Sequence, residues 1–532
     1  MADISFTSAG VPRSGSTASA VFLLVGAMTI VLTDAIAGTA LSMARLDIMG
    51  GTHASADEFA KLDYGYTAAK LVAFVSTPWL AGAFNLYRSV MIAGAVMTAA
   101  CYSAAYTGDL NVMFGLRLLQ GASGGVLLVG AQSLLFRVFP MRQQPFVQSV
   151  YAVGSVVAPA TLAPYMQGWL LDQIDWSVIF LCSVPFGIAG IVMLALAPQA
   201  EEVDSPKIRF DAVGLILFAV AAFTLTFVLN QGNRWDWFGD STVVWATIVG
   251  MAALGIQVVR QLFAPDKATT FNFAVFRNAN FAFGIAASLA AGFALLGSSF
   301  VIPSFAVSVL RMTPTAAGSL LLPSTLMFVG SLFLTAFMIQ KLKLPGVITI
   351  PLGILGLMLA MWLLSGSSSG SGIPDMTPAI LIRGLALGFL FLSITLVTLL
   401  SLDKTLLIYG VALFSIGRQM GGLAGISFLQ TFIEDQTAHN RAVLAAHILP
   451  GREEVIARIG NLGRLLASHG TEAGLASKEA VALIGKAVAL QSTTIAFDTA
   501  FFAITLFFFG AAPTLIIWKI VLGRVLAPKA AK

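Results

Sequence analysis

Fourteen apolar stretches, each long enough to cross a bilayer as a helix, follow one another along this chain of 532 residues. A transmembrane helix needs about 20 apolar residues, and lipid offers no partners to an unpaired backbone group, so each stretch must form a helix. Only 10% of the residues are charged, whereas soluble domains carry about 25%. The sequence therefore predicts an all-α polytopic membrane protein. The stretches lie at about 19–42, 66–84, 89–107, 113–136, 146–166, 178–198, 211–230, 241–262, 280–304, 315–340, 345–365, 377–400, 406–433 and 491–521.

The positions of the basic residues indicate how these helices are oriented. An even number of spans places both termini on one side of the membrane. The even-numbered junctions and the termini are rich in Lys and Arg, while the short odd-numbered junctions carry only Arg45, Lys61, Arg234 and Arg311. Basic residues favour the cytoplasmic side. We therefore expect both termini to be cytoplasmic, in a multi-pass protein of the bacterial inner membrane.

The two halves of the chain resemble each other. Arg117 opens the fourth span and Arg383 opens the twelfth, so spans one to six and nine to fourteen read as parallel repeats, as in many transporters. We predict five units: a cytoplasmic tail (1–18), a six-helix bundle (19–200), a linker with two inserted helices (201–265), a second six-helix bundle (266–521) that includes a periplasmic segment (435–490), and a cytoplasmic tail (522–532). A twelve-helix carrier with two interfacial segments at 211–262 is the alternative.

The segment LRLLQGASGG, residues 116–125, contains the most unusual intramembrane residues. Arg117 and Gln120 lie three residues apart on one helix face, and an intramembrane arginine should face a protein or water-lined interior. Snorkelling to the outer interface is the alternative. Gly121, Gly124 and Gly125 give the helix a smooth side that a neighbour can approach closely.

Other ionisable residues fall inside predicted spans. Asp34 lies in span one, and such an acid beside a cation can exchange a proton during transport; a flooded vestibule without coupling is the alternative. Lys70 near the outer end of span two suits either function or snorkelling. Arg418 lies midway along span thirteen. Asp498 lies in the first turns of span fourteen, where a helix-dipole role is expected.

The block from residue 117 to 187 resembles the major facilitator superfamily, in particular its fourteen-helix drug:proton antiporter branch of the EmrB/QacA type. LRLLQGASGG resembles the family's helix-four motif, in which the arginine is linked to proton transfer. APYMQGWLLDQIDWSVIFLCSVPFG, residues 163–187, resembles the helix-five antiporter motif and the turn after it, and RQMGGLAG, residues 418–425, resembles the thirteenth-helix signature. The resemblance implies a major facilitator fold with 14 transmembrane helices in two six-helix bundles plus a two-helix insert.

Three departures from the family pattern bear on function. Ala163 and Gln167 replace two glycines of the antiporter motif, and Gln167 brings a polar side chain toward the cavity. The loop AGAFNLYRSV, residues 81–90, lacks the acid that normally helps latch the cytoplasmic gate. Asp34 is offset by one residue from the family's helix-one acid.

These observations lead to residue roles. Asp34, Arg117 and Lys70 are predicted to couple protons, and Asp34, Gln120, Gln167, Arg383 and Arg418 to line the substrate cavity. We also expect the two motifs to form one close contact between spans four and five. Its residues are Gly121, Gly124, Gly125, Pro164 and Gly168.

The resemblance implies proton-coupled efflux of amphipathic or aromatic organic compounds by alternating access. A carrier dedicated to one metabolite or siderophore-like molecule, and a non-transporting scaffold or receptor, are the alternatives. The sequence has no phosphate-binding loop, nucleophile elbow or paired-His metal site, so we expect a secondary transporter with no cofactor or metal, no enzyme activity and no nucleic-acid partner.

The long segment 435–490 should contain helical pieces, because Val455, Ile459, Leu462 and Leu466 form one apolar stripe. It is either a solvated cap or a docking surface. The resemblance implies an EmrA-like periplasmic membrane fusion protein and an outer-membrane channel as partners, beside the substrate, protons and the lipid bilayer.

Overall fold

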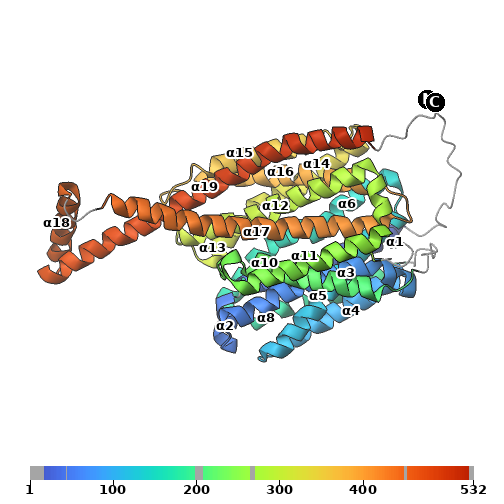
Figure 1. The fold of residues 1–532 in the computed structure, drawn as a ribbon, viewed down its shortest axis with the longest axis horizontal. Coiled ribbons are helices and arrows are strands. Elements are labelled where there is room, and N and C mark those ends of the chain that lie inside the picture. The colour runs from blue at the N-terminus through green and yellow to red at the C-terminus, as the bar shows by residue number, and fades with distance from the viewer. Residues whose placement is uncertain (1–16, 44, 198–207, 264–269, 449–451, 526–532) are drawn as a thin grey trace.

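The computed structural model describes residues 17–43, 45–197, 208–263, 270–448 and 452–525. Every regular element in these ranges is a helix, and most of the helices run side by side in one elongated bundle (Figure 1). Parts of the predicted tails and the unit boundaries near residues 200 and 265 lie outside the described residues, so the boundaries stay a prediction.

The helices of the first half correspond to the first six predicted spans. The fifth span is made of three helical pieces and the sixth of two. The elements are α1 (Thr17–Met43), α2 (Arg45–Thr52), α3 (Ala56–Phe84), α4 (Leu86–Ala104), α5 (Leu110–Val138), η1 (Met141–Gln143), α6 (Gln144–Ala152), η2 (Val153–Leu162), α7 (Ala163–Gln173), α8 (Ser177–Leu181) and α9 (Val184–Ala195).

The inserted pair and the second half follow in the same way. The insert is α10 (Ala212–Gln231) and α11 (Ser241–Phe263), with η3 (Trp237–Gly239) between them. The second half contains η4 (Phe273–Arg277), α12 (Ala279–Ser308), α13 (Pro314–Ser319), α14 (Leu322–Gln340), α15 (Thr349–Leu364), α16 (Ile373–Leu399), α17 (Leu407–Ala446), α18 (Glu453–Ser468) and α19 (Ala473–Val525).

The number of membrane-spanning helices is consistent with fourteen. Eleven helical stretches of the described residues are long and apolar enough to cross a membrane, including both inserted helices, and α15 is a shorter apolar helix. The helices α4 and α17 pack among them. Each predicted apolar stretch therefore coincides with one helical stretch of the structure.

Helix starts are fixed by polar caps. Asp109 accepts hydrogen bonds from the N–H groups of Asn111 and Val112 at the start of α5, at 2.7 and 3.3 Å. Asn278 caps α12 in the same way, and Ser55 and Glu58 form a capping box before α3. Such caps satisfy N–H groups that have no partner within the helix.

The fifth span is broken because its middle adopts π-helical geometry. The segment η2 contains Pro159, which has no N–H to donate to the helix. Such a break bends a helix. Single-turn π-bulges commonly occur at functional sites. It divides the stretch predicted at 146–166 into α6, η2 and α7, and η2 packs against α1 and α14.

Neighbouring helices repeat between the two halves. In the first half α3 and α4 pack on α5, and α1 packs on α9 and η2. In the second half α14 and α15 pack on α16, and α12 packs on α19 and α17. These are corresponding spans of the predicted repeat. The halves meet through α3 with α17, α6 with α14, and α7 with α13.

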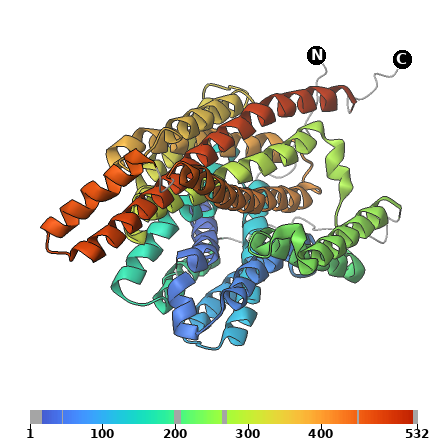
Figure 2. The same cartoon turned by 60° about the vertical axis from the view of Figure 1, so that its left-hand side comes forward.

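The inserted pair lies at the side of the bundle, where Figure 2 shows it in green. Within the bundle α10 packs on α3 and also contacts α17. The loop between α10 and α11 bonds to both halves. Trp235 Nε1 donates to Asp57 of α3 at 3.3 Å, and Trp237 Nε1 donates to Thr431 of α17 at 3.2 Å. The insert therefore bridges the two halves.

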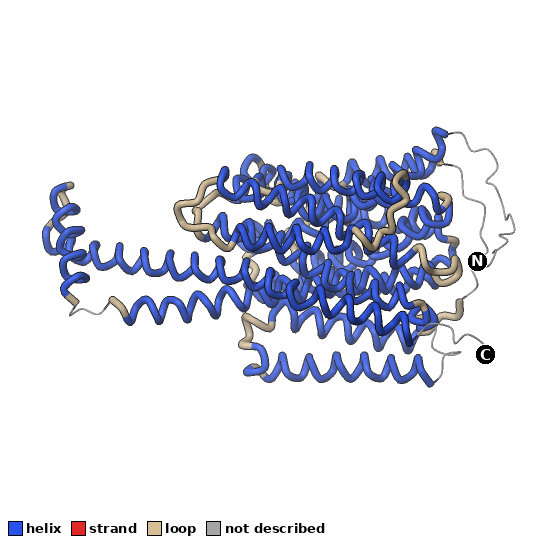
Figure 3. Tube along the Cα trace, turned by 90° about the horizontal axis from the view of Figure 1, so that it is seen from above, coloured by secondary structure: helices blue, strands red, loops and turns tan. Residues whose placement is uncertain are grey.

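A helical extension projects from one end of the bundle. Figures 1 and 3 show α17 and α19 continuing beyond the other helices, with α18 crossing their tips. This is the end that carries α2 and α13, and we call it the distal end. The predicted helices within 435–490 are confirmed. The stripe of α18 is its less exposed face, and α18 packs on α19.

Candidate substrate and proton site

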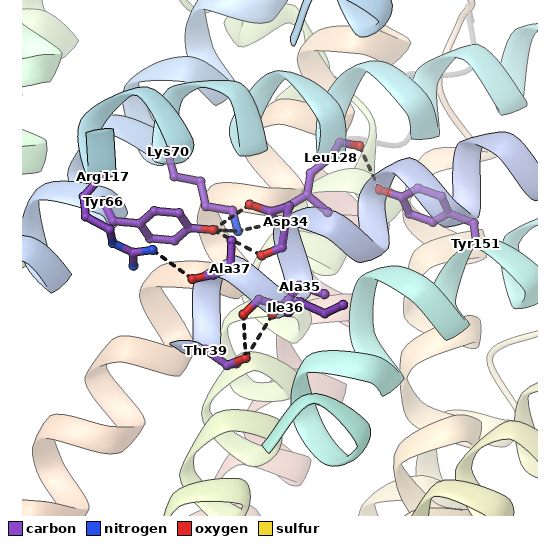
Figure 4. A network of polar contacts seen from close by, with 10 residues as sticks. All are labelled: Asp34, Ala35, Ile36, Ala37, Thr39, Tyr66, Lys70, Arg117, Leu128 and Tyr151. Atoms are coloured by element: carbon purple, nitrogen blue, oxygen red, sulfur yellow. Dashed lines mark hydrogen bonds and ion pairs between the residues drawn. The ribbon is translucent and has the colours of Figure 1, made fainter. Parts of the chain in front are cut away.

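A buried carboxylate on α1 lies at the centre of a polar cluster in the first half (Figure 4). Asp34 Oδ2 is 2.7 Å from Lys70 Nζ, and the Tyr66 hydroxyl donates to Asp34 Oδ1 at 2.6 Å. The exposed fractions of Asp34 and Lys70 are only 2% and 7%. A buried ion pair of this kind is costly to separate, so Asp34 and Lys70 must exchange partners or protons together.

The positions of these side chains follow from two helix surfaces. Tyr66 and Lys70 are four residues apart on α3 and therefore share one face. On α5, a Cβ at position 124 would collide with Asp34 Oδ1, and a Cβ at position 121 would collide with the backbone carbonyl of Tyr66. Only glycine lets α1 and α3 approach α5 this closely.

Arg117 lies on the other side of Tyr66. Its Nη1 donates to the Ala37 carbonyl at 2.8 Å and to Gln120 Oε1 at 2.9 Å. Its guanidinium carbon lies 4.1 Å from the centre of the Tyr66 ring, a cation–π contact. The residue is fully buried, which contradicts snorkelling.

Of the two buried cations near Asp34, Lys70 is the one that pairs with it. Lys70 forms the ion pair, and the Tyr66 ring separates Asp34 from Arg117. Lys70 also points inward, so the snorkelling alternative for it is wrong in this structure. Gln120 orients Arg117 and donates to the Ala100 carbonyl at 3.3 Å.

Gln167 reaches α1 one turn from the cluster. Its Nε2 donates to the Ile36 carbonyl at 2.7 Å and to Thr39 Oγ1 at 3.0 Å. Its Oε1 is buried without a hydrogen-bond partner in the described structure. The amide therefore fastens α7 to α1 beside Asp34 and keeps one acceptor unused.

The two predicted arginines of the second half lie in separate surroundings. Arg383 of α16 is bound by serine hydroxyls of α12 and α14. Arg418 of α17 lies with its guanidinium carbon 5.9 Å from the Phe414 ring centre. The Tyr151 hydroxyl of α6 donates instead to the Leu128 carbonyl of α5 at 2.8 Å (Figure 4). The five residues predicted to line the cavity are thus divided between the halves, with Asp34, Gln120 and Gln167 around α1.

Comparison with known proteins identifies the family. A model of the Major Facilitator Superfamily matches residues 23–426. The chain belongs to the Major Facilitator Superfamily. It is therefore a multi-pass membrane transporter and not an enzyme.

Individual relatives agree with this assignment. The multidrug export protein EmrB of Escherichia coli strain K12 is 24% identical over 439 residues, 80% of this chain and 84% of the relative. A tetracenomycin C resistance and export protein of Streptomyces glaucescens is 25% identical over 68% of this chain and 66% of its own length. The solved structure of the proton:xylose symporter XylE has the same fold, with a TM-score of 0.53 and 12% identity over 79% of this chain and 90% of that one.

The predicted close contact between spans four and five is wrong. The glycines of α5 do not meet α7. Gly121 and Gly125 face the α3 backbone and Gly124 faces Asp34, whereas Gly168 packs on Thr315 of α13. The backbone of Pro164 likewise faces Gly318 of α13. The smooth surfaces of the two motifs therefore serve different neighbours, one within the first half and one between the halves.

The expected role of Asp498 is also wrong. Because α19 begins at Ala473, Asp498 lies many turns from the helix N-terminus and cannot be stabilised by its dipole. Its Oδ1 is buried with no hydrogen-bond partner in the described residues. The apolar pattern marked only the intramembrane part of this helix and missed the polar extension before it.

Sequence reasoning missed Tyr66, which contacts all three predicted coupling residues. It donates to Asp34, lies under Arg117, and its ring centre is 5.3 Å from Lys70 Nζ. The signal that could have found it is its spacing of one turn before Lys70. In the described ranges no group of three His, Cys, Asp or Glu side chains could hold a metal ion.

Proposed function

We propose that this transporter exports amphipathic or aromatic organic compounds from the cytoplasm or the inner leaflet in exchange for protons. The observation that carries the proposal is the buried cluster of Asp34, Lys70 and Tyr66 at the junction of α1, α3 and α5. Relatives named as a multidrug export protein and as an antibiotic export protein support this choice of cargo.

The cluster suits proton coupling because protonation of Asp34 alone would unbalance its charges. With Asp34 ionised, the pair with Lys70 holds α1 against α3. Protonation of Asp34 removes the attraction and leaves Lys70 without its counter-charge, so the two helices part more easily. A bound proton shifts an equilibrium between two conformations by its differential affinity for them, and Asp34 supplies that difference.

The remaining residues act around this exchange. Arg117, held by Gln120 and Ala37, keeps the Tyr66 ring in place and adds positive potential beside Asp34. Gln167, Arg383 and Arg418 offer polar groups to a substrate between the halves. The α7–α13 contact at Gly168 and the α3–α17 contact are the surfaces that part as the halves rock.

We further propose that the termini are cytoplasmic in a bacterial inner membrane, which makes the distal extension periplasmic. The extension carries an apolar cavity of 450 Å³ lined by residues of α17, α18 and α19, among them Leu444, Val455 and Ile484. This surface suits an EmrA-like membrane fusion protein that connects to an outer-membrane channel.

Transport by purified protein in vesicles tests the proposal. An imposed pH gradient should drive uphill movement of a fluorescent aromatic drug by the native protein. Asp34→Asn should abolish uphill movement and leave exchange at equal pH on both sides. Asp403→Asn, an exposed acid between α16 and α17, is the matched control and should behave as native. Uphill transport at the native rate by Asp34→Asn would refute the coupling role.

A further inference from the structure

The second half contains a fully buried arginine surrounded by serines. Arg383 of α16 has no exposed surface. Its Nε donates to Ser298 Oγ at 2.8 Å, its Nη2 to Ser299 Oγ at 2.6 Å, and its Nη1 to Ser324 Oγ at 3.3 Å. The three hydroxyls come from α12 and α14, so the guanidinium lies where three helices meet.

Local sequence explains how the serines reach it. Ser298 and Ser299 are adjacent on α12 and bind different nitrogens of the same guanidinium. On α16, glycine follows the arginine, and a Cβ at position 384 would lie 2.8 Å from Ser324 Oγ and collide with the Ser324 carbonyl. The missing side chain lets α14 approach until its hydroxyl meets Arg383.

This cluster leaves the positive charge of Arg383 without compensation. The ion pairs recorded between described residues are Lys70–Asp34, Arg234–Asp57 and Arg260–Asp211, and Arg383 takes part in none of them. Hydroxyl groups satisfy hydrogens but carry no negative charge. A buried charge is costly unless it is paired, so the site calls for an anion.

The number of N–H donors on Arg383 also favours an anionic ligand. A guanidinium has five N–H hydrogens, and the serines accept three of them. The Ser298 hydroxyl donates a hydrogen bond to the Ala294 carbonyl at 2.6 Å. No acceptor for the Ser324 hydroxyl appears in the described structure. Two N–H groups and one O–H group therefore remain for a ligand. Planar N–H pairs of arginine match the two oxygens of a carboxylate.

The cluster also borders the partner half. Ser299 Oγ donates weakly, at 3.4 Å, to the Ala160 carbonyl in the broken segment η2. Contacts of α12 with η2 and of α16 with α6 place the same region against the first half. The Ser299–Ala160 contact is therefore one that must break when the halves move apart on this side.

The corresponding arginine of the first half has different neighbours. Arg117 lies beside the Asp34 cluster, separated from the carboxylate only by the Tyr66 ring. The repeat thus places one arginine near an acid and the other among hydroxyls. Arg383 is therefore the one of the two arginines whose hydrogen-bond partners are all neutral hydroxyls.

We infer that Arg383, with Ser298, Ser299 and Ser324, binds the anionic group of the exported compound, and that the substrate class is amphipathic organic carboxylates. This inference rests on the proposed export function and specifies its cargo. The apolar part of such a compound would lie among the aliphatic and aromatic side chains between the halves, and its carboxylate would replace the Ser299–Ala160 contact.

Equilibrium binding of two matched probes to the full-length protein in lipid tests the inference. The probes are 1-naphthaleneacetate and its uncharged amide, 1-naphthaleneacetamide, which have nearly the same shape. The native protein should bind the carboxylate about tenfold or more tightly than the amide, since charge-assisted hydrogen bonds are the stronger ones. Arg383→Gln should remove this preference and leave amide binding unchanged, while Arg383→Lys should retain part of it.

A serine pair on α14 provides the matched control. Ser324→Ala should weaken carboxylate binding about tenfold or more, which is the cost of one hydrogen bond to a charged group, without affecting the amide. Ser331→Ala, two turns along the same helix and hydrogen-bonded only to its own helix at Phe328, should leave both affinities native. This pair remains informative if Arg383→Gln does not fold.

The outcomes separate the inference from the function on which it rests. Native protein that binds the carboxylate no more tightly than the amide overturns the anion site. So does equal weakening of both probes in Ser324→Ala, because that would indicate a structural role only. Native protein that exports neither these probes nor a cationic dye against a pH gradient refutes the export function itself. Export of the dye without any carboxylate preference refutes only the anion site.

Discussion

A single methyl group at position 124 tests how α1, α3 and α5 form the cluster. In Gly124→Ala the new Cβ would occupy the space of Asp34 Oδ1. The carboxylate must then turn away from Tyr66, Lys70 or both, since the α5 backbone is held by its own helix. Gly115→Ala is the matched control, because it lies on the same helix and a Cβ there meets nothing within 4 Å.

The expected magnitude follows from two opposing effects. Alanine in place of glycine within a helix stabilises by about 0.5–1 kcal/mol. Interhelical hydrogen bonds in membranes are worth about 0.6 kcal/mol on average and about 1.7 kcal/mol at most. Loss of the two short bonds of Asp34, at 2.6 and 2.7 Å, should cost about 2 kcal/mol. We therefore expect Gly124→Ala to be destabilised by about 1 kcal/mol and Gly115→Ala to be slightly stabilised.

Two measurements follow from this difference. Thermal unfolding in detergent should place Gly124→Ala below the native protein and Gly115→Ala at or above it. Transport driven by a pH gradient should fall in Gly124→Ala by more than the lower amount of folded protein explains. The reason is that the displaced carboxylate is the proposed proton carrier. If Gly124→Ala matches Gly115→Ala in both measurements, the close contact between Asp34 and α5 is refuted.

Three further perturbations have expected results. Tyr66→Phe removes the hydroxyl that donates to Asp34 but keeps the ring under Arg117, so protein yield should stay native while uphill transport falls several-fold; native transport in vesicles would contradict this. Asp211 caps α10 and accepts from Gly214 N at 2.9 Å, Arg260 at 3.0 Å and Thr270 at 2.7 Å; burial raises its pKa, but these donors outweigh burial and hold the pKa below its ordinary value. Because the pKa of Asp211 is lowered in the folded protein, its stabilisation is present near neutral pH and is lost as the pH falls through that pKa. Asp211→Asn should therefore lower the stability by about 2 kcal/mol at neutral pH and by less in acid, which thermal melts at several pH values would measure. An equal loss of stability at every pH would exclude the charge effect. Arg234→Ala breaks an ion pair with Asp57 whose side chains are 44% and 46% exposed, and such pairs are worth at most about 1 kcal/mol, so both stability and transport should stay nearly native; a large loss of either would mean that the insert needs this pair to bridge the halves.

Each apolar stretch of the sequence coincides with a helical stretch, but the sequence did not show where the helices end. Hydropathy reports the thickness of the bilayer, so it marks only the part of each helix that lies in lipid. The α3 helix starts at Ala56, ten residues before the predicted span, because Asp57, Glu58 and Lys61 continue the helix into water. Both α17 and α19 continue in the same way into the distal extension. Asp498 therefore lies far from the start of α19 and not in its first turns.

The site was predicted in part. Burial of charge is unfavourable in lipid and therefore rare, so Asp34, Lys70, Arg117 and Arg383 could be selected from the sequence alone. Their partners could not, because a partner depends on how far each helix is rotated about its axis. That rotation is set by contacts such as Gly124 with Asp34, and a glycine in the sequence does not reveal which helix it faces.

In both halves, glycines on the helix that carries a buried arginine let a neighbouring helix come close, yet they admit different groups. Beside Arg117, Gly121 and Gly124 admit the Tyr66 backbone and the Asp34 carboxylate. Beside Arg383, the glycine at 384 admits a serine of α14. The backbone frame is thus common to both repeats, while the side chain that enters the space decides whether the arginine lies near an acid or among neutral hydroxyls. Because Asp34 gives the first-half cluster a titratable acid and the neighbours of Arg383 are neutral hydroxyls, a repeat of the same fold can divide proton exchange and anion binding between its halves.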